Sequence, residues 1–210
     1  MRLVVPKAPL RRILRWTKRL LFAGGVSLLV YCGFVLMDAW SFQRGQRRQL
    51  ELRLANIQEA NGGVSQTASP ASRRALPPVA PGGLVGRMDI PRLGISTIVM
   101  EGTTAKTLRR AIGHIEGTAL PGQPGNVGIS GHRDTFFRPL RHIRENDIIT
   151  LTTLLGEYRY RVVFTKLVGP YDVTVLNPGG DEILTLVTCY PFYFVGPAPY
   201  RFIVRAERVA

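Results

Sequence analysis

Cys189 has the setting in this sequence that most favours chemistry. It follows the apolar run 182–188 and precedes Tyr190 and Pro191, so a predicted strand ends there and a loop begins. A strand end that opens into a loop can present a side chain to a substrate from a rigid scaffold. A thiolate can act there as a nucleophile if one group handles the proton and another stabilises charge on the attacked carbonyl. Judged by residue type alone, a single cysteine in a β domain is more often buried and inert.

Three histidines compete for the role of proton carrier. His132 follows the predicted strand 126–130 directly and has Gly131 beside it, which permits close backbone approach. His114 and His142 lie in apolar or helical settings, where we expect a structural or exposed role. No spacing among the histidines and Cys189 resembles a metal-binding motif, so we predict no metal and no cofactor.

Two arginines could supply the positive charge, namely Arg201 and Arg205 in the predicted last strand. Their even separation puts both on one face of a strand, so alternation alone cannot choose between them. The second cysteine, Cys32, lies in a long apolar run and is most simply a small apolar residue there.

Residues 84–210 carry these side chains and form the candidate domain. Alternating Tyr and Arg residues in 158–162 are typical of a sheet with one wet face. Helical turns are expected at 105–112 and at 135–143, the second interrupted by Pro139. Many short strands separated by turn residues favour a closed or nearly closed barrel. Strands are predicted at 84–90, 93–100, 126–130, 147–153, 158–168, 172–176, 182–188 and 201–209.

An uncharged stretch behind a basic leader predicts a membrane anchor near the N-terminus. Residues 1–19 carry seven basic residues and no acidic one, and the 18 residues of 20–37 carry no charge. Such a run is long enough to cross a bilayer as a helix, and Trp40 suits the interface beyond it. A cleaved signal peptide usually has a shorter apolar core, and a buried soluble helix rarely follows a wholly basic leader. We therefore expect a cytoplasmic leader at 1–19 and a transmembrane anchor at 20–42.

Two segments separate the anchor from the domain. Residues 43–60 have apolar positions at helical spacing and predict a short juxtamembrane helix, most simply a solvated stalk. Residues 61–83 are rich in Gly, Pro, Ser and Ala and predict a flexible linker. Of the net charge of +14, the leader carries seven units and the domain four, so the charge is mainly a topology signal. The basic residues occur with neither a DNA-recognition helix nor an aromatic base-stacking motif, and we expect no nucleic-acid partner.

Several motifs of 84–210, taken in order, resemble the sortases, which are membrane-anchored cysteine transpeptidases of the bacterial envelope. The most specific are Thr185-Leu186-Val187-Thr188-Cys189, which is similar to the family's T-L-x-T-C motif, and the Arg-bearing strand that begins at Arg201. Gly131-His132-Arg133-Asp134 and the start at Met88-Asp89-Ile90-Pro91 agree with them. The segment around Cys189-Tyr190-Pro191-Phe192 looks closest to the class D-like branch. The resemblance implies a mostly β fold, a closed, mainly antiparallel sortase-type barrel with short helices on its loops.

The resemblance also implies roles for single residues. Cys189 would be the nucleophile, His132 the general acid and later base, and Arg201 the cation near the oxyanion, while Arg205 would be structural. We further expect Thr188 and Tyr190, which flank the nucleophile, to contact the substrate.

The implied partners are exported proteins with a C-terminal L-P-x-T-G-like sorting signal, an amine nucleophile of the envelope, and membrane lipid through residues 20–42. The enzyme would be single-pass in the cytoplasmic membrane, with its N-terminus inside and its catalytic domain outside.

Two alternatives remain open at this point. A cysteine peptidase would hydrolyse the same signal without transfer. A non-catalytic module would instead display basic loop residues to anionic envelope polymers, namely Arg133, Arg138, Arg141 and Arg144. No Asp-Pro-aromatic lid motif occurs in 61–83, so we expect an open groove and not a pilin polymerase.

Overall fold

The computed structural model describes residues 7–61, 79–179, 182–194 and 196–209. The chain divides into two compact units, Met1–Ser41 and Phe42–Ala210. One helix, α1 (Lys7–Asn61), contributes to both units. The predicted anchor at 20–42 and the predicted juxtamembrane helix at 43–60 both lie within this helix.

The first unit consists of the N-terminal part of α1. Within the described residues, one helix is long and apolar enough to cross a membrane, and this candidate span lies in Arg12–Ile57. Its large apolar side chains are exposed, with Phe22 at 75% and Leu29 at 73%. Such side chains have no protein to pack against in this unit, and hydrocarbon is the environment that suits them.

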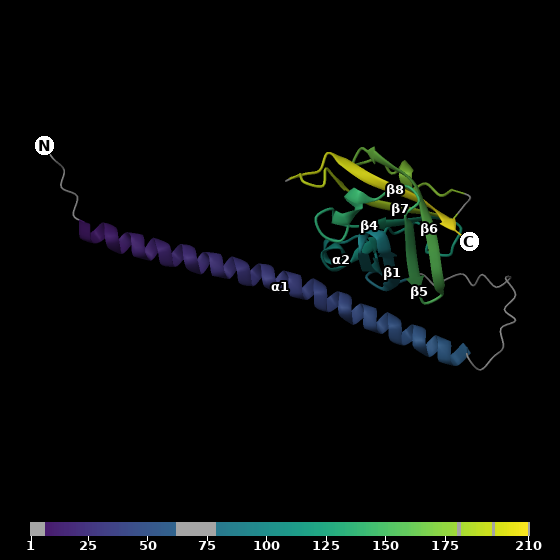
Figure 1. Ribbon diagram of the computed structural model, residues 1–210, viewed down its shortest axis with the longest axis horizontal. Helices are drawn as coiled ribbons and strands as arrows, with labels where there is room; N and C mark the ends of the chain where they lie inside the picture. The colour runs from purple at the N-terminus through teal and green to yellow at the C-terminus, as the bar shows by residue number, and fades with distance from the viewer. Residues whose placement is uncertain (1–6, 62–78, 180–181, 195, 210) are drawn as a thin grey trace. The chain divides into compact units, whose positions relative to one another are not determined.

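The second unit is built around a closed barrel of eight strands (Figure 1). Neighbouring strands pair in the order β1-β2-β3-β4-β7-β8-β6-β5, and all pairs are antiparallel except β2 with β3 and β4 with β7. This confirms the closed, mainly antiparallel barrel. The strands are β1 (Leu84–Ile90), β2 (Ile95–Glu101), β3 (Ile112–His114), β4 (Gly125–Ser130), β5 (Ile148–Thr153), β6 (Gly156–Val168), β7 (Glu182–Tyr190) and β8 (Tyr200–Val209).

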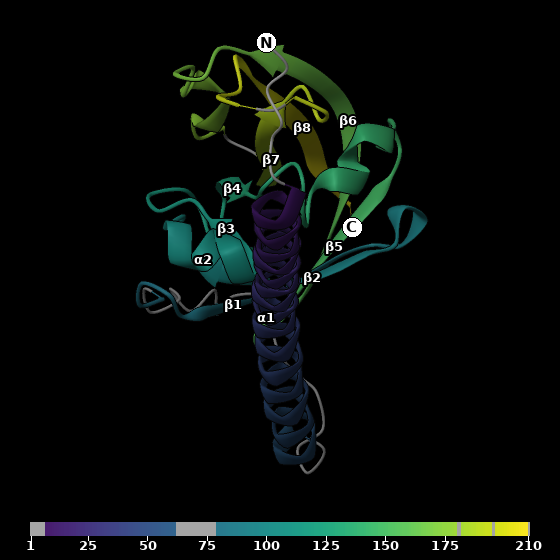
Figure 2. The same ribbon diagram turned by 90° about the vertical axis from the view of Figure 1, so that its left-hand side faces the viewer.

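Short helices lie on the connections, as expected. The α-helix α2 (Ala105–Arg110) lies beside β3 (Figure 2) and begins where the Thr104 hydroxyl accepts a hydrogen bond from the Thr107 N–H (3.2 Å). The remaining three are 3₁₀ turns: η1 (Pro91–Leu93), η2 (Arg138–His142) and η3 (Thr174–Leu176). Pro139 lies in the first turn of η2, where its missing N–H costs nothing, so it starts this helix and does not interrupt it.

Two strand predictions differ from the structure. The strand predicted at 172–176 is wrong, because this segment contains η3. The Asp172 carboxylate accepts hydrogen bonds from the N–H (3.1 Å) and the hydroxyl of Thr174, and this local pairing folds the chain into a turn. The strand β3 was missed because its three residues are too few to show a period.

The barrel interior is the hydrophobic core. Every second side chain along the strands points into it. In β6, Tyr160 and Val162 are buried while Arg159 and Arg161 are exposed, as their alternation predicted. In β7 and β8, Leu184, Leu186, Val204 and Ala206 point inward and are fully buried. Burying apolar surface at roughly 25 cal/mol per Å² stabilises the closed barrel and so fixes the ends of its strands.

The helix segment that begins at Phe42 packs on the barrel, which differs from the expected solvated stalk. The Gln43 side chain donates to the carbonyl of Arg110 (2.7 Å) and accepts from the N–H of Ile98 (2.9 Å). Arg47 donates to Ser96, and Leu50 is fully buried. Since one amide side chain satisfies backbone groups of both β2 and α2, this part of α1 belongs to the barrel's own packing.

The predicted linker 61–83 lies mostly outside the described residues, which resume at Val79. Val79 packs against the core, and the N–H of Gly82 donates to the carbonyl of Glu101 (2.9 Å). The N–H of Glu101 donates in turn to the carbonyl of Gly83 (2.8 Å). These contacts join 79–83 to the barrel, ahead of the boundary predicted at 84.

Candidate active site

The register of β7 and β8 brings Cys189 and Arg201 together. The two residues are direct partners across this antiparallel pair, and both are half-buried. Leu184 and Leu186 point into the core, so Cys189, at odd spacing from them, faces outward. Directly opposed residues have Cβ atoms about 4.5–5.5 Å apart, which places a cation beside the thiol. The thiol is free.

The same register separates the two candidate arginines. Arg205 pairs with Thr185, about 13 Å further along the sheet from Cys189 at roughly 3.3 Å per residue. Its guanidinium donates to the carbonyl of Val175 (3.2 Å), and burial lowers its pKa. Arg201 instead donates through Nη1 to the carbonyls of Ala198 (3.2 Å) and Tyr200 (3.1 Å).

His132 leaves the barrel at the same end as Cys189, because β4 and β7 are parallel neighbours. Their pairing runs to Ser130 opposite Val187, one residue before the loop that carries His132. The next residue, Gly131, donates through its N–H to the carbonyl of Val187 (3.2 Å). The His132 side chain itself is exposed. An exposed imidazole at this position is accessible to a substrate that lies over the strand ends.

Gly131 connects the loop that carries His132 (the histidine loop) to β7, the strand that carries Cys189. The Thr188 hydroxyl donates to the Gly131 carbonyl (2.7 Å), and Thr188 is 2% exposed. A Cβ at position 131 would lie 2.8 Å from the Phe137 ring and 3.0 Å from Ile112, so only glycine allows this approach. The structure therefore gives Thr188 a partner in the protein at the position where we expected a substrate contact.

Tyr190, the other expected substrate contact, belongs to an aromatic cluster beside Cys189. Its ring stacks on Phe202 with centroids 6.3 Å apart and meets the edge of Phe192 at 5.9 Å. Tyr190 is half-buried, so part of its ring remains accessible. Phe192 and Phe202 pack against the barrel core. Tyr190 follows Cys189 directly in β7, so the two side chains leave the strand toward opposite faces.

Arg133 joins the histidine loop to the loop between β7 and β8, and the sequence pattern did not indicate this. Its guanidinium donates to the carbonyls of Pro191 (3.0 Å), Phe194 (2.8 Å) and Gly196 (3.0 Å). It also lies over the Phe194 ring, 5.9 Å from the centroid. One side chain next to His132 thus holds the loop that connects Cys189 with Arg201.

Asn126 was also missed, although an asparagine inside a predicted strand is a signal, since strands are depleted in it. It is 2% exposed and accepts from the Thr185 hydroxyl (2.7 Å). It donates to the carbonyls of Val175 (3.0 Å) and Asn177 (3.3 Å). These bonds hold the loop between β6 and β7 against the outer face of β4 and β7.

The other two histidines have hydrogen-bond partners of their own. His114 is 2% exposed, with Nδ1 2.8 Å from a Glu101 carboxylate oxygen and Nε2 2.9 Å from the Ala119 carbonyl. His142 is exposed and accepts a hydrogen bond from Arg141 (2.8 Å). Among the described residues no group of three or more His, Cys, Asp or Glu side chains could hold a metal ion.

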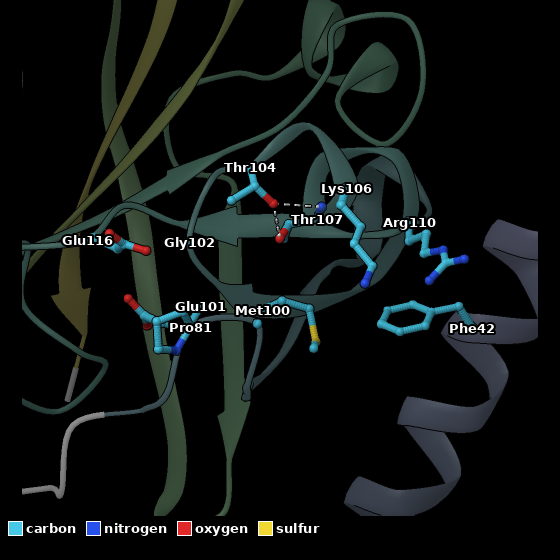
Figure 3. A pocket seen from close by; sticks show the side chains of 11 residues that line it. Phe42, Pro81, Met100, Glu101, Gly102, Thr104, Lys106, Thr107, Arg110 and Glu116 are labelled. Atoms are coloured by element: carbon cyan, nitrogen blue, oxygen red, sulfur yellow. Dashed lines mark hydrogen bonds between the residues drawn. The ribbon is translucent and has the colours of Figure 1, made fainter.

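A hollow of about 440 Å³ lies elsewhere on the second unit (Figure 3). Its walls come from the end of β2, from α2 and the loop before it, and from Phe42 of α1. Neither β7, β8 nor the His132 loop contributes to it. The hollow is therefore separate from the site around Cys189.

Similarity to known proteins covers the barrel and its site residues. The family model described as "Sortase domain" matches residues 88–209. Sortase D of Bacillus subtilis is 32% identical over 190 residues, which are 90% of this chain and 96% of that protein. Sortase SrtE1 of Streptomyces coelicolor is 29% identical over 206 residues, covering 88% of this chain and 54% of that one. A solved Sortase D5 transpeptidase from Clostridium perfringens matches with a TM-score of 0.65 and 25% identity, over 81% of this chain and 99% of that structure. The range that the family model matches includes His132, Cys189 and Arg201.

Proposed function

Because the chain belongs to the sortase family of cysteine transpeptidases, we propose that it cleaves an L-P-x-T-G- or L-P-x-T-A-like sorting signal of exported proteins and transfers them to an envelope amine. The observation that carries this proposal is the direct pairing of Cys189 with Arg201 at the barrel end from which the His132 loop also leaves. A nucleophile, a proton carrier and a permanent cation at one place are the parts that acyl transfer requires.

The proposed reaction has two halves. The Cys189 thiolate attacks the threonine carbonyl carbon of the signal, and the oxyanion that forms is stabilised by the Arg201 guanidinium. The bond to the following Gly or Ala breaks as the His132 imidazolium protonates the leaving amine, which leaves a thioacyl enzyme. The incoming amine then attacks the thioester carbonyl and gives a proton to His132, and the thiolate departs.

The hydrogen bonds of Arg201 suit its proposed role. Both of its bonds to Ala198 and Tyr200 use Nη1, and its Nε and Nη2 have no partner among the residues that the structure describes. Two carbonyls thus hold Nη1 of the guanidinium, while the N–H groups of Nε and Nη2 remain for an oxyanion. A lysine has no second arm, so it cannot be held by the loop and donate to substrate in the same geometry.

The two flanking residues receive different proposed roles. Thr188 acts through its bond to Gly131, which sets the start of the His132 loop. Tyr190 contacts the substrate through the accessible part of its half-buried ring, at the end of β7. Arg205 remains structural, because it bonds Val175 and pairs with Thr185, away from the nucleophile.

We also propose the topology that the basic leader favours. Residues 1–19 remain in the cytoplasm, 20–42 cross the membrane, and the barrel works outside. The membrane then keeps the enzyme where exported clients emerge.

Product analysis tests the proposed reaction and distinguishes it from hydrolysis. We expect the full chain in detergent, given an L-P-x-T-A peptide and an excess of triglycine, to yield a product in which triglycine replaces the part of the peptide that follows threonine, together with the released amine fragment. Mass spectrometry detects it directly. A hydrolysed product alone at saturating amine would favour the peptidase alternative, and an intact peptide with several amines and signal variants would contradict the proposal.

The non-catalytic alternative loses support from the arrangement of the basic loop. Arg133, which it would display to polymers, is bound by three backbone carbonyls and an aromatic ring. Its donors are therefore directed into the protein.

Replacing Arg133 is expected to slow the reaction without removing any reacting group. Arg133→Ala frees the loop between Cys189 and Arg201, and we expect kcat/KM for peptide cleavage to fall by roughly 10- to 100-fold, as small misplacements of catalytic groups do. Arg133→Lys should not restore it, because an ammonium lacks the planar fork. Steady-state kinetics with a fluorescent peptide measure both.

Arg138→Ala is the matched control for Arg133, since Arg138 lies in the same connection and its side chain is exposed. It should keep kcat/KM within about twofold, as surface substitutions usually do. Equal activity of the Arg133→Ala variant and the wild type would show that the hydrogen bonds of Arg133 do not position Cys189 or Arg201.

A further inference from the structure

His114 is a buried histidine that the proposed reaction does not use. It is the last residue of β3, a strand of three residues, and its side chain is 2% exposed. β3 pairs with β4, with Gly113 opposite Ser130 and His114 opposite Ile129. His132, the proposed proton carrier, follows Ser130 by two residues. His114 therefore lies on the strand that flanks the start of the histidine loop.

The partners of His114 indicate which of its ring nitrogens carries a proton. Nε2 lies 2.9 Å from the carbonyl oxygen of Ala119 and 3.0 Å from the hydroxyl oxygen of Thr118. A carbonyl can only accept, and the Thr118 hydroxyl already donates its proton to the carbonyl of Ile115 (2.7 Å). Since both neighbours of Nε2 are acceptors, we assign a proton to Nε2, which donates to them.

The other ring nitrogen connects His114 to β2. Nδ1 lies 2.8 Å from a carboxylate oxygen of Glu101, which is the last residue of β2 and is 7% exposed. The backbone makes the same connection, because the N–H of Gly102 donates to the carbonyl of His114 (3.0 Å). One buried imidazole thus links the end of β2 to the turn 115–119, and a fully paired buried network of this kind is rigid.

The turn 115–119 continues the pairing of β4 where β3 ends. The N–H of Ile115 donates to the carbonyl of Gly128 (2.8 Å), and the N–H of Gly128 donates to the Thr118 hydroxyl oxygen (3.1 Å). That oxygen therefore accepts hydrogen bonds from Gly128 and from His114. A side chain takes the place of strand backbone at this point, and His114 orients it.

The end of β4 is held from two sides. On the side of β7, the Thr188 hydroxyl donates to the Gly131 carbonyl (2.7 Å). On the other side lie the short strand β3 and the turn 115–119, both of which His114 joins to β2. A shift of the strand end would move His132 relative to Cys189, and a misplacement of about 1 Å can lower a rate by roughly 100-fold.

We propose that His114 is a positioning residue for His132. Through Thr118 it fixes the end of β4, and so the distance between the His132 imidazole and the leaving amine. The inference rests on the proposed function, in which His132 protonates that amine. His114 itself touches no reacting group, because both of its ring nitrogens are bound by protein partners. The expected signature is a loss confined to the step that needs His132.

Two substrates separate that step from the rest of the reaction. A peptide amide requires a proton on its leaving amine, whereas a thioester of the same L-P-x-T acyl group releases a thiolate, which leaves without one. With both substrates the Cys189 sulfur attacks the threonine carbonyl and the same thioacyl enzyme forms. A variant that misplaces only His132 should therefore lower kcat/KM for the amide and spare the thioester.

Two amide side chains at position 114 test which bond matters. Asparagine places its amide near the position of Nδ1, and glutamine places its amide near the position of Nε2. We expect His114→Asn to lower kcat/KM for the amide by roughly 10- to 30-fold and for the thioester by less than about threefold. His114→Gln should recover most of the amide rate, because its NH₂ group can donate to both Ala119 and Thr118. Steady-state kinetics of the full chain in detergent measure both substrates.

Thr118 offers a second matched pair that leaves His114 in place. Thr118→Val keeps the methyl group near Gly128 but removes the oxygen that accepts from its N–H, and it should reproduce the loss for the amide. Thr118→Ser keeps the hydroxyl and should remain within about twofold of the wild type. Circular dichroism checks the fold of each variant. The rate of Cys189 alkylation by iodoacetamide should stay within about twofold, because β7 is unchanged.

Equal losses for the two substrates in His114→Asn and Thr118→Val would overturn the proposal, since they would reflect less active enzyme and not a misplaced His132. An unchanged amide rate in both variants would also overturn it, as would a His114→Gln variant no more active than His114→Asn. A wild type that cleaves neither substrate would contradict the proposed function, and this inference with it.

Discussion

Replacing Cys189 with alanine should abolish peptide cleavage while leaving the barrel folded. The residue faces out of the barrel and is half-buried, so losing its sulfur leaves no cavity in the core. Loss of a covalent nucleophile removes the chemical step, and we expect kcat/KM to fall by roughly 10⁴-fold or more, to background. A fluorescent L-P-x-T-A peptide measures the rate, and circular dichroism the fold.

Cys32→Ala is the matched control, because it removes the other thiol from an exposed position on α1. It should keep full activity. Iodoacetamide should inactivate the wild type and the Cys32→Ala variant alike by labelling Cys189 in the folded protein. Residual cleavage by Cys189→Ala above background would contradict the thioacyl mechanism.

Replacing Arg201 with lysine should have the second largest effect, although it keeps the charge. Removing one donor to an oxyanion typically costs about 10²- to 10³-fold in kcat, and lysine loses both the fork and its attachment to the carbonyls of Ala198 and Tyr200. We expect kcat to fall by that amount with a smaller change in KM, because the oxyanion exists only in the transition state and the intermediate.

Arg205→Lys distinguishes this role from a general need for positive charge on β8. Arg205 is on the same face, but it pairs with Thr185 and donates to Val175. Its replacement should lower the melting temperature and leave kcat nearly unchanged. A near-normal kcat for Arg201→Lys, or a larger loss of kcat for Arg205→Lys, would remove Arg201 from the proposed mechanism.

Much of the barrel could be predicted from the sequence because its signals are local. Alternation in 158–162 and turn residues between apolar runs indicated the strands, and seven of the eight predicted runs correspond to strands. Cys189 and His132 could be singled out because each directly follows such a run. The predictions were wrong at η3 and β3. Local hydrogen bonds in η3 and the short length of β3 hide the alternation that marks a strand.

Features that depend on distant parts of the chain could not be predicted from local patterns, and for Arg201 only the family resemblance made the choice. Alternation put Arg201 and Arg205 on one face, and only the register of β7 with β8 brings Arg201 opposite Cys189. Arg133 looked like one basic loop residue among four, because its partners lie 58 to 63 residues away. Gln43 was part of an apparent stalk for the same reason, since it contacts Ile98 and Arg110.

The parallel pairing of β4 with β7 has a consequence for how the enzyme becomes active. Parallel neighbours cannot form as a hairpin, and the bond that joins Gly131 to Thr188 spans 57 residues of chain. Closing so long a loop is slow compared with local turns, so the histidine loop and the nucleophile strand should meet late in folding. Until then, the chain carries Cys189 without His132 and Arg201 beside it. The complete site would thus form only once the whole barrel has closed.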